Sequence, residues 1–253
     1  MLRRLVATFE LALSVAMTTN RMWSGSPVAH PSVLLHPATD YGHRHWASVL
    51  DGAAGSTVID ATAGNGHDTL ALVRALARAG GGTLCAVDVQ PIALERTRDR
   101  LRSELGVAGW HIDEGADTWR LELPPATVDL RWALGDHQEV LRSVAPESVR
   151  LVVFNLGYLP GTDKSVVTTA PGTVRALEQA EAALCPGGCL SVALYPGHPE
   201  GVEEEGAVLD HASQLPQERW SVHHTSWLNQ RSKRNGRRAP SLVLIQRVHD
   251  RYE

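Results

Sequence analysis

A glycine-rich segment from Asp60 to Thr69, with the sequence DATAGNGHDT, carries the strongest chemical signal in the chain. It follows a short apolar run and precedes a stretch with helical periodicity. Glycines at such a turn let the backbone approach a ligand, and the amides at the helix start face that ligand. The third glycine of a dinucleotide loop and the lysine of a Walker loop are both missing. The pattern therefore favours S-adenosyl-L-methionine, held by Gly64 and Gly66, over an ordinary tight turn, which stays the alternative.

Polar residues after the next two expected strands support the same cofactor. Asp88 ends an apolar run about 20 residues after the glycine-rich loop, where a carboxylate can accept hydrogen bonds from both ribose hydroxyls. Gln90 follows on the same turn. Asp136 and His137 come just after a further expected strand, where an adenine would lie. For this Asp–His pair, a surface or helix-capping role is the alternative.

The tetrad Asn155-Leu-Gly-Tyr158 comes at the carboxyl end of the expected fourth strand, LVVFN. Ligands of parallel sheets bind outside the carboxyl ends of the strands. The tetrad resembles the Asn/Asp-Pro-Pro-aromatic motif of amino methyltransferases, which implies that Asn155 holds a target amine while Tyr158 packs against the base. Such holding is mostly a positioning task. A strand end at which the asparagine caps a turn is the alternative.

Strands that alternate with helices position these residues. Helical patterns are expected at 67–79, 91–105, 173–184 and 200–215, and strands at 57–62, 83–89, 128–134, 151–155, 189–195, 220–228 and 242–248. This alternation predicts a mostly parallel sheet covered on both faces, and the last two strands, joined without a helix, predict an antiparallel final strand. The stretch 106–127 has no clear periodicity and is expected to be an insertion. We therefore expect an α/β, Rossmann-like fold with seven strands.

Four stretches together resemble the "putative rRNA methylase" family, now associated with tRNA 5-aminomethyl-2-thiouridine methyltransferases. They are Asp60–Thr69, Asn155–Ser165, Tyr195–Gly201 and Leu228–Gln230. The resemblance implies a class I methyltransferase fold, often dimeric, that methylates the aminomethyl nitrogen of the wobble uridine in the tRNA anticodon region. It also implies cofactor contacts at Asn65, Asp68, Asp88, Gln90, Asp136 and His137, and active-face residues at Asn155, Tyr158, Asp163, Lys164 and His198.

An aminomethyl nitrogen is protonated in water and must lose a proton before it can attack a methyl group. Asp163 and His198 are the candidate bases, and desolvation of the amine is the alternative. A basic segment then offers a surface for RNA phosphates beside the active face, or else forms a solvated turn. Its residues are Arg231, Lys233, Arg234, Arg237 and Arg238. A methyltransferase of rRNA or of a small molecule, or a non-catalytic RNA-binding protein with the cofactor fold, are the alternative functions.

Composition limits the remaining possibilities. A net charge of −4 excludes a basic, histone-like binder, and three cysteines are too few for a disulfide framework. No apolar run is long enough for a membrane-spanning helix, and the histidines show no spacing that we would assign to a metal site. Residues 1–39 are rich in Ser, Thr and Arg and contain one acidic residue, Glu10. This composition predicts a plastid or mitochondrial transit peptide before a catalytic domain at 40–253, with a cytoplasmic protein as the alternative.

Overall fold

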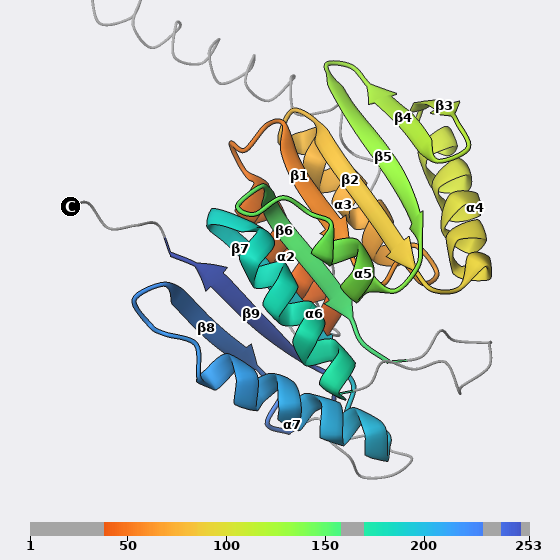
Figure 1. Ribbon diagram of the computed structural model, residues 1–253. Helices are drawn as coiled ribbons and strands as arrows, with labels where there is room; N and C mark the ends of the chain where they lie inside the picture. The colour runs from red at the N-terminus through yellow and green to blue at the C-terminus, as the bar shows by residue number, and fades with distance from the viewer. Residues whose placement is uncertain (1–37, 158–169, 230–238, 249–253) are drawn as a thin grey trace, which may run out of the picture. The chain divides into compact units, whose positions relative to one another are not determined.

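The computed structural model describes residues 38–157, 170–229 and 239–248 (Figure 1). The helices are α2 (Ala38–Leu50), α3 (His67–Arg78), α4 (Pro91–Val107), α5 (His137–Arg142), α6 (Ala170–Ala183) and α7 (Pro199–Ser213). The strands are β1 (Ser56–Asp60), β2 (Gly82–Asp88), β3 (His111–Glu114), β4 (Thr118–Leu123), β5 (Ala126–Leu134), β6 (Val149–Asn155), β7 (Leu184–Leu194), β8 (Trp220–Thr225) and β9 (Ser241–Arg247).

All these strands form one mixed sheet in the order β3-β4-β5-β2-β1-β6-β7-β9-β8. The five strands from β5 to β7 are parallel. The final strand β9 lies antiparallel to both β7 and β8, as the sequence predicts. The sheet order reverses between β1 and β6, and an open α/β sheet binds its ligands at such a point, outside the carboxyl ends of the strands.

The expected count of seven strands is wrong for the part of the chain that the structure describes, which holds nine. The difference is the stretch 106–127, expected to be an insertion without regular structure, where β3 and β4 form a hairpin that extends the sheet beyond β5. Trp119 and Leu121 of β4 are buried, whereas Thr118 and Arg120 are exposed, and Trp119 packs edge-on against Trp132 of β5. The alternation of buried and exposed residues in so short a strand is a weak signal in the sequence, but it is sufficient for pairing once the edge of β5 is available.

Two helices also lie outside the sequence prediction. The short helix α5 follows Asp136, and α2 precedes the first strand. Helix α2 buries Ala38, Gly42 and Trp46, each four positions from the next and therefore on one face of the helix. The indole Nε1 of Trp46 donates to Ser191 Oγ of β7 at 2.8 Å, which anchors α2 on the sheet.

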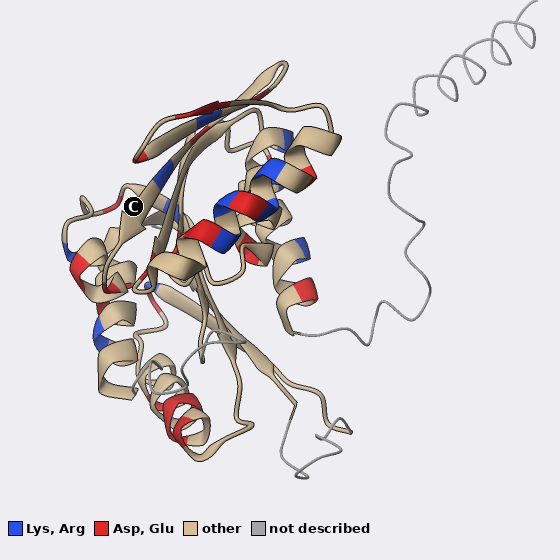
Figure 2. Cartoon of the chain, turned by 90° about the vertical axis from the view of Figure 1, so that its right-hand side faces the viewer, with Lys and Arg blue, Asp and Glu red and all other residues tan. Residues whose placement is uncertain are grey.

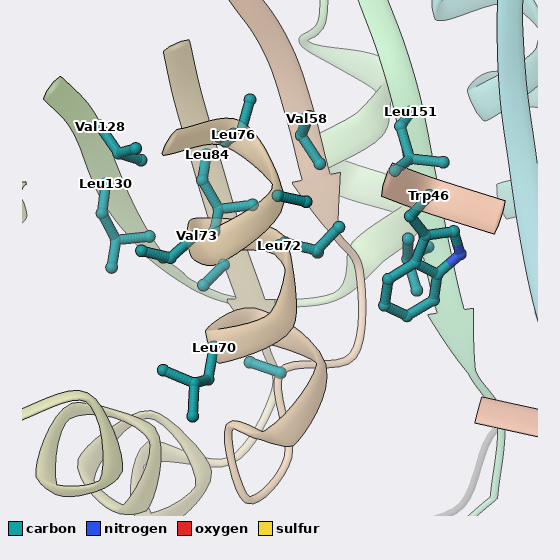
Figure 3. Close-up of a cluster of buried hydrophobic side chains, with 14 of the residues drawn as sticks. Trp46, Val58, Leu70, Leu72, Val73, Leu76, Leu84, Val128, Leu130 and Leu151 are labelled. Carbon is teal, nitrogen blue, oxygen red and sulfur yellow. The ribbon is translucent and has the colours of Figure 1, made fainter. Parts of the chain in front are cut away.

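The sheet separates two apolar cores. Helices α2, α3 and α4 cover one face, and α5, α6 and α7 cover the other (Figure 1). Alternate residues of each strand enter opposite cores, as in β6, where Leu151 enters the first and Val152 the second. Figure 3 shows the first core, in which Trp46 of α2 and the leucines of α3 pack over the central strands. Among the helices described, none has both the length and the apolar character that crossing a membrane requires.

Candidate functional site

The glycine-rich loop joins β1 to α3 at the carboxyl edge of the sheet, where hydrogen bonds to the buried carboxylate of Asp60 stabilise it. Asp60 accepts hydrogen bonds from Thr69 Oγ1 at 2.6 Å and from the Thr62 amide at 3.2 Å. Burial, and then the charge of Asp68, raises the pKa of Asp60 to about 7. Gly66 caps α3 with φ 78°, and a Cβ added there would lie 2.9 Å from Thr97 Cα of α4. Only glycine suits both the left-handed backbone and this close approach.

Asp88 ends β2 and connects the glycine-rich loop to the start of α4. Its Oδ2 accepts from the Gly64 amide and its Oδ1 from the Gln90 amide, both at 2.9 Å. Burial raises the pKa of Asp88, while hydrogen bonds from the backbone amides of Gln90, Gly64 and Val89 act in the opposite direction. Because a carboxylate has about four lone-pair sites, Asp88 can still accept from a ligand hydroxyl. Gln90 enters this arrangement through its backbone amide.

Three apolar side chains remain exposed beside Asp88. Val89, Ile92 and Leu134 are 46%, 40% and 59% exposed, and Leu134 is the register partner of Asp88 in the neighbouring strand β5. The flat face of a purine can pack against such aliphatic groups. These three residues could not be predicted from the sequence, because an exposed aliphatic residue at a strand end has no recognisable motif.

Asp136 and His137 are both engaged in structural contacts. Asp136 caps α5, accepting from the Gln138 amide at 2.7 Å, which is the capping alternative that the sequence left open. His137 packs edge-on against Phe154, with ring centroids 5.5 Å apart, and burial lowers its pKa. A cofactor contact of either residue stays a prediction.

Asn65 lies in the loop but contacts α4. Its side-chain oxygen accepts from Arg96 at 3.3 Å, and its carbonyl oxygen accepts from Arg100 Nε at 2.7 Å. These bonds hold the loop against α4, along which acidic and basic residues are interleaved (Figure 2). A direct cofactor contact of Asn65 likewise stays a prediction.

Asn155 and Asp68 come together although 87 positions separate them. Asn155 Nδ2 donates to Asp68 Oδ2 at 2.8 Å, and the Asn155 amide donates to Thr62 Oγ1 at 2.7 Å. The second oxygen of Asp68 lies 2.6 Å from His43 Nε2 of α2. Tyr195, just after β7, hydrogen-bonds Asn155, while burial and then the charge of Asp68 raise its pKa to about 12, so its hydroxyl is neutral near pH 7. Sequence reasoning missed His43 and Tyr195, since contacts over such separations leave no local signal.

His198, one of the two candidate bases, caps α7. Its Nδ1 accepts from the Gly201 amide at 3.1 Å and lies 3.2 Å from Glu200 Oε2. A role in proton transfer stays a prediction. Other predicted residues lie outside the described part of the chain, namely Tyr158, Asp163, Lys164, Arg231, Lys233, Arg234, Arg237 and Arg238.

The described residues fit S-adenosylmethionine by their chemistry. Asp88 would accept from the ribose hydroxyls, and the apolar patch of Val89, Ile92 and Leu134 would cover the adenine. Asp68 and Asp88 each lie close enough to Asp60 for their charges to act on it, and carboxylates at this edge of the sheet suit a cationic sulfonium. Across the described residues, no cluster of three or more His, Cys, Asp or Glu side chains could hold a metal ion.

The chain is similar to a known family and to a curated relative. Residues 84–246 match the family described as "Putative rRNA methylase". Over 197 residues, or 76% of the chain, the sequence is 36% identical to a chloroplastic tRNA (mnm(5)s(2)U34)-methyltransferase of Arabidopsis thaliana. The matched part spans 65% of that relative's length.

Solved structures of bacterial proteins show the same fold. A protein described as a putative rRNA-methylase from Clostridium thermocellum is 27% identical, with a TM-score of 0.67, and 84% of this chain matches 98% of it. A protein described as a putative methyltransferase from Streptococcus mutans, in complex with SAH, is 30% identical, with a TM-score of 0.64. That match covers 84% of this chain and 99% of the other. The α/β, Rossmann-like fold expected from the sequence is confirmed.

Proposed function

We propose that this chain, an S-adenosylmethionine-dependent methyltransferase that belongs to the "Putative rRNA methylase" family, methylates the aminomethyl nitrogen of a tRNA wobble uridine. The reaction would convert 5-aminomethyl-2-thiouridine to 5-methylaminomethyl-2-thiouridine. The name of the Arabidopsis relative supports this acceptor. Because the match spans only part of that relative, its activity is carried over to this chain as a proposal.

The orientation of the Asn155 side chain is the structural observation that carries the proposal. The amide nitrogen of Asn155 faces Asp68, since Nδ2 donates to Asp68 Oδ2 at 2.8 Å. The amide oxygen therefore faces away from Asp68. An amide oxygen fixed at the carboxyl end of β6 can accept a hydrogen bond from the N–H of an entering amine and direct its lone pair.

When bound, the cofactor would supply an electrophilic methyl group on a positively charged sulfur. The acceptor amine would have to be neutral to take up that methyl group. One proton is thus released for each ammonium group that is methylated. Asp163 and His198 remain the candidate acceptors of that proton, and a site that excludes water favours the neutral amine without either.

The RNA partner is proposed to be the tRNA anticodon region. We propose that Lys164 and the basic segment from Arg231 to Arg238 contact its phosphates, because phosphate contacts supply most of the sequence-independent affinity for nucleic acids. We also propose that the protein acts as a homodimer and that residues 1–39 direct it to a plastid or mitochondrion. The word "chloroplastic" in the relative's name is consistent with the plastid alternative.

Mass spectrometry of nucleosides tests the acceptor directly. The protein is incubated with labelled S-adenosylmethionine and tRNA that carries 5-aminomethyl-2-thiouridine, and in parallel with ribosomal RNA. Labelled 5-methylaminomethyl-2-thiouridine is the expected product. Label found only in ribosomal RNA, or in neither substrate, would contradict the tRNA assignment.

An Asn155→Ala variant tests the role of the Asn155 side-chain amide. It should bind the cofactor normally but lose more than tenfold in kcat, which corresponds to more than about 1.4 kcal/mol of transition-state stabilisation. Gln214→Ala, which removes an exposed amide after α7, is the matched control and should retain full activity. If Asn155→Ala has a kcat within threefold of wild type, the tetrad is only a structural turn.

A further inference from the structure

Helix α2 brings a histidine to the active edge of the sheet. Near the C-terminal end of α2, the Val49 carbonyl accepts from Arg150 Nε, close to where β6 begins. In the middle, Trp46 bonds to Ser191 within β7. The helix therefore runs opposite to the parallel strands, and its N-terminal part lies at their carboxyl ends, where His43 contacts Asp68.

The contacts of His43 form a chain that ends at the acceptor site. His43 Nε2 lies 2.6 Å from Asp68 Oδ1, and Asp68 Oδ2 lies 2.8 Å from Asn155 Nδ2. Three elements, α2, α3 and β6, thus meet through one carboxylate. The carboxylate is 6% exposed and lies in the first turn of α3, where the helix dipole favours negative charge. Each oxygen of the Asp68 carboxylate has a hydrogen-bond partner, so the orientation of the carboxylate plane is fixed.

We propose that His43 and Asp68 act as positioning residues that orient the Asn155 amide toward an acceptor amine. This inference rests on the proposed function, in that it takes a nitrogen of the acceptor as the group that Asn155 holds. It also reassigns Asp68, expected from the sequence to contact the cofactor, to the support of the acceptor side. Without the His43 N–H, the Asp68 carboxylate can rotate, and the Asn155 amide, which Tyr195 also hydrogen-bonds, loses its fixed partner on the Asp68 side.

The role of His43 is separable from a purely structural one. The side chain is 29% exposed, whereas Trp46 on the same helix is 2% exposed and carries the buried bond to the sheet. The imidazole rests on the Trp46 ring, with centroids 4.7 Å apart, which holds it in place for Asp68. Loss of His43 should therefore leave α2 docked through Trp46 while it releases Asp68.

Kinetics of His43 variants test the proposal. His43→Ala should lower kcat on the order of tenfold to a hundredfold, the effect expected when a positioning group is misplaced. Cofactor affinity by calorimetry and the midpoint of urea unfolding should stay close to wild type. His43→Gln keeps an N–H donor and should recover most of the lost activity. Ser48→Ala, at an exposed position of the same helix, is the matched control and should behave as wild type.

A second readout needs no acceptor. The side-chain amide of Asn155 is observed by NMR in protein labelled with ¹⁵N-asparagine, and its signal is identified by its absence in Asn155→Ser. His43→Ala should shift this signal, and His43→Gln should return it toward its wild-type position. A wild-type protein that fails to methylate tRNA would refute the proposed function, whereas the NMR comparison would still test the positioning chain. If His43→Ala retains both wild-type kcat and an unshifted signal, or if His43→Gln is no better than His43→Ala, the inference is wrong.

Discussion

Replacement of Asp88 by alanine should separate cofactor binding from stability. The carboxylate is expected to accept from two ribose hydroxyls, and hydrogen bonds to a charged group contribute about 1.5–3 kcal/mol each. The expected loss of binding free energy is then about 3–6 kcal/mol, and at 1.4 kcal/mol per factor of ten this weakens the affinity by about 10² to 10⁴-fold.

The same substitution should have a smaller effect on the fold, because two contributions oppose each other. The amides of Gly64 and Gln90 lose their acceptor, which loosens the loop. However, burial raises the pKa of Asp88, so the folded protein also loses the cost of keeping a charge partly away from water. The loss of stability should therefore be well below the loss of binding free energy.

Titration calorimetry with S-adenosylmethionine, together with urea unfolding, measures the two quantities. Asp99→Ala removes the same charge from an exposed position on α4 and should bind the cofactor as wild type does. The reasoning is refuted if Asp88→Ala binds within threefold of wild type while its unfolding midpoint falls. Asp88 would then brace the loop without contacting the ribose.

Three further expectations concern the loop and the basic segment. The pKa of Asp60 is raised from 3.8 to about 7. Ionisation of Asp60 in the folded protein therefore lowers the free energy of unfolding by about 4 kcal/mol at pH values above 7, and this free energy increases as the pH falls from 7 toward 4. Asp60→Asn should flatten this profile in urea unfolding at several pH values, and an unchanged profile would contradict the assignment. Gly66→Ala should destabilise the fold by more than about 1 kcal/mol through its positive φ and its contact with Thr97, whereas Gly106→Ala, in open space within α4, should be neutral or stabilising in the same assay. Replacement of Arg234, Arg237 and Arg238 by alanine should weaken tRNA binding in a filter-binding titration. It should also reduce the slope of log affinity against log salt concentration by up to about three units, and a wild-type slope would locate the RNA surface elsewhere.

The sequence predicts those parts of the fold that are encoded locally. The central strands are short apolar runs bounded by turn residues, and the glycines of the loop follow β1 directly, so the carboxyl edge and its cofactor could be expected. The hairpin at 111–123 was missed because its alternation involves only a few inward residues, including Trp119 and Leu121. Its pairing is decided by the exposed edge of β5, which local sequence does not reveal.

The acceptor side of the site illustrates the opposite case. Asn155 could be expected from its place at a strand end, but its partners come from α2 and α3 and meet it only in the folded chain. His43 belongs to no recognised motif, and nothing within 20 positions on either side indicates a contact with Asp68. Tyr195 belonged to a recognised motif, yet its contact with Asn155 depends on the pairing of β6 with β7. Contacts that arise from topology need the sheet order before they can be predicted.

The separation of the two apolar cores by the sheet has a thermodynamic consequence. Leu72 of α3 and Leu177 of α6 belong to different apolar cores, and the backbone of the sheet lies between them. Substitutions that lie far apart and share no contacts usually change the free energy of unfolding additively. A substitution of Leu177 should therefore lower the free energy of unfolding without moving Asp68 or Asn155, whereas a change in the packing of α2 or α3 should also move these groups, which are proposed to hold the acceptor. The two cores thus differ in how closely their packing is coupled to the acceptor side of the site.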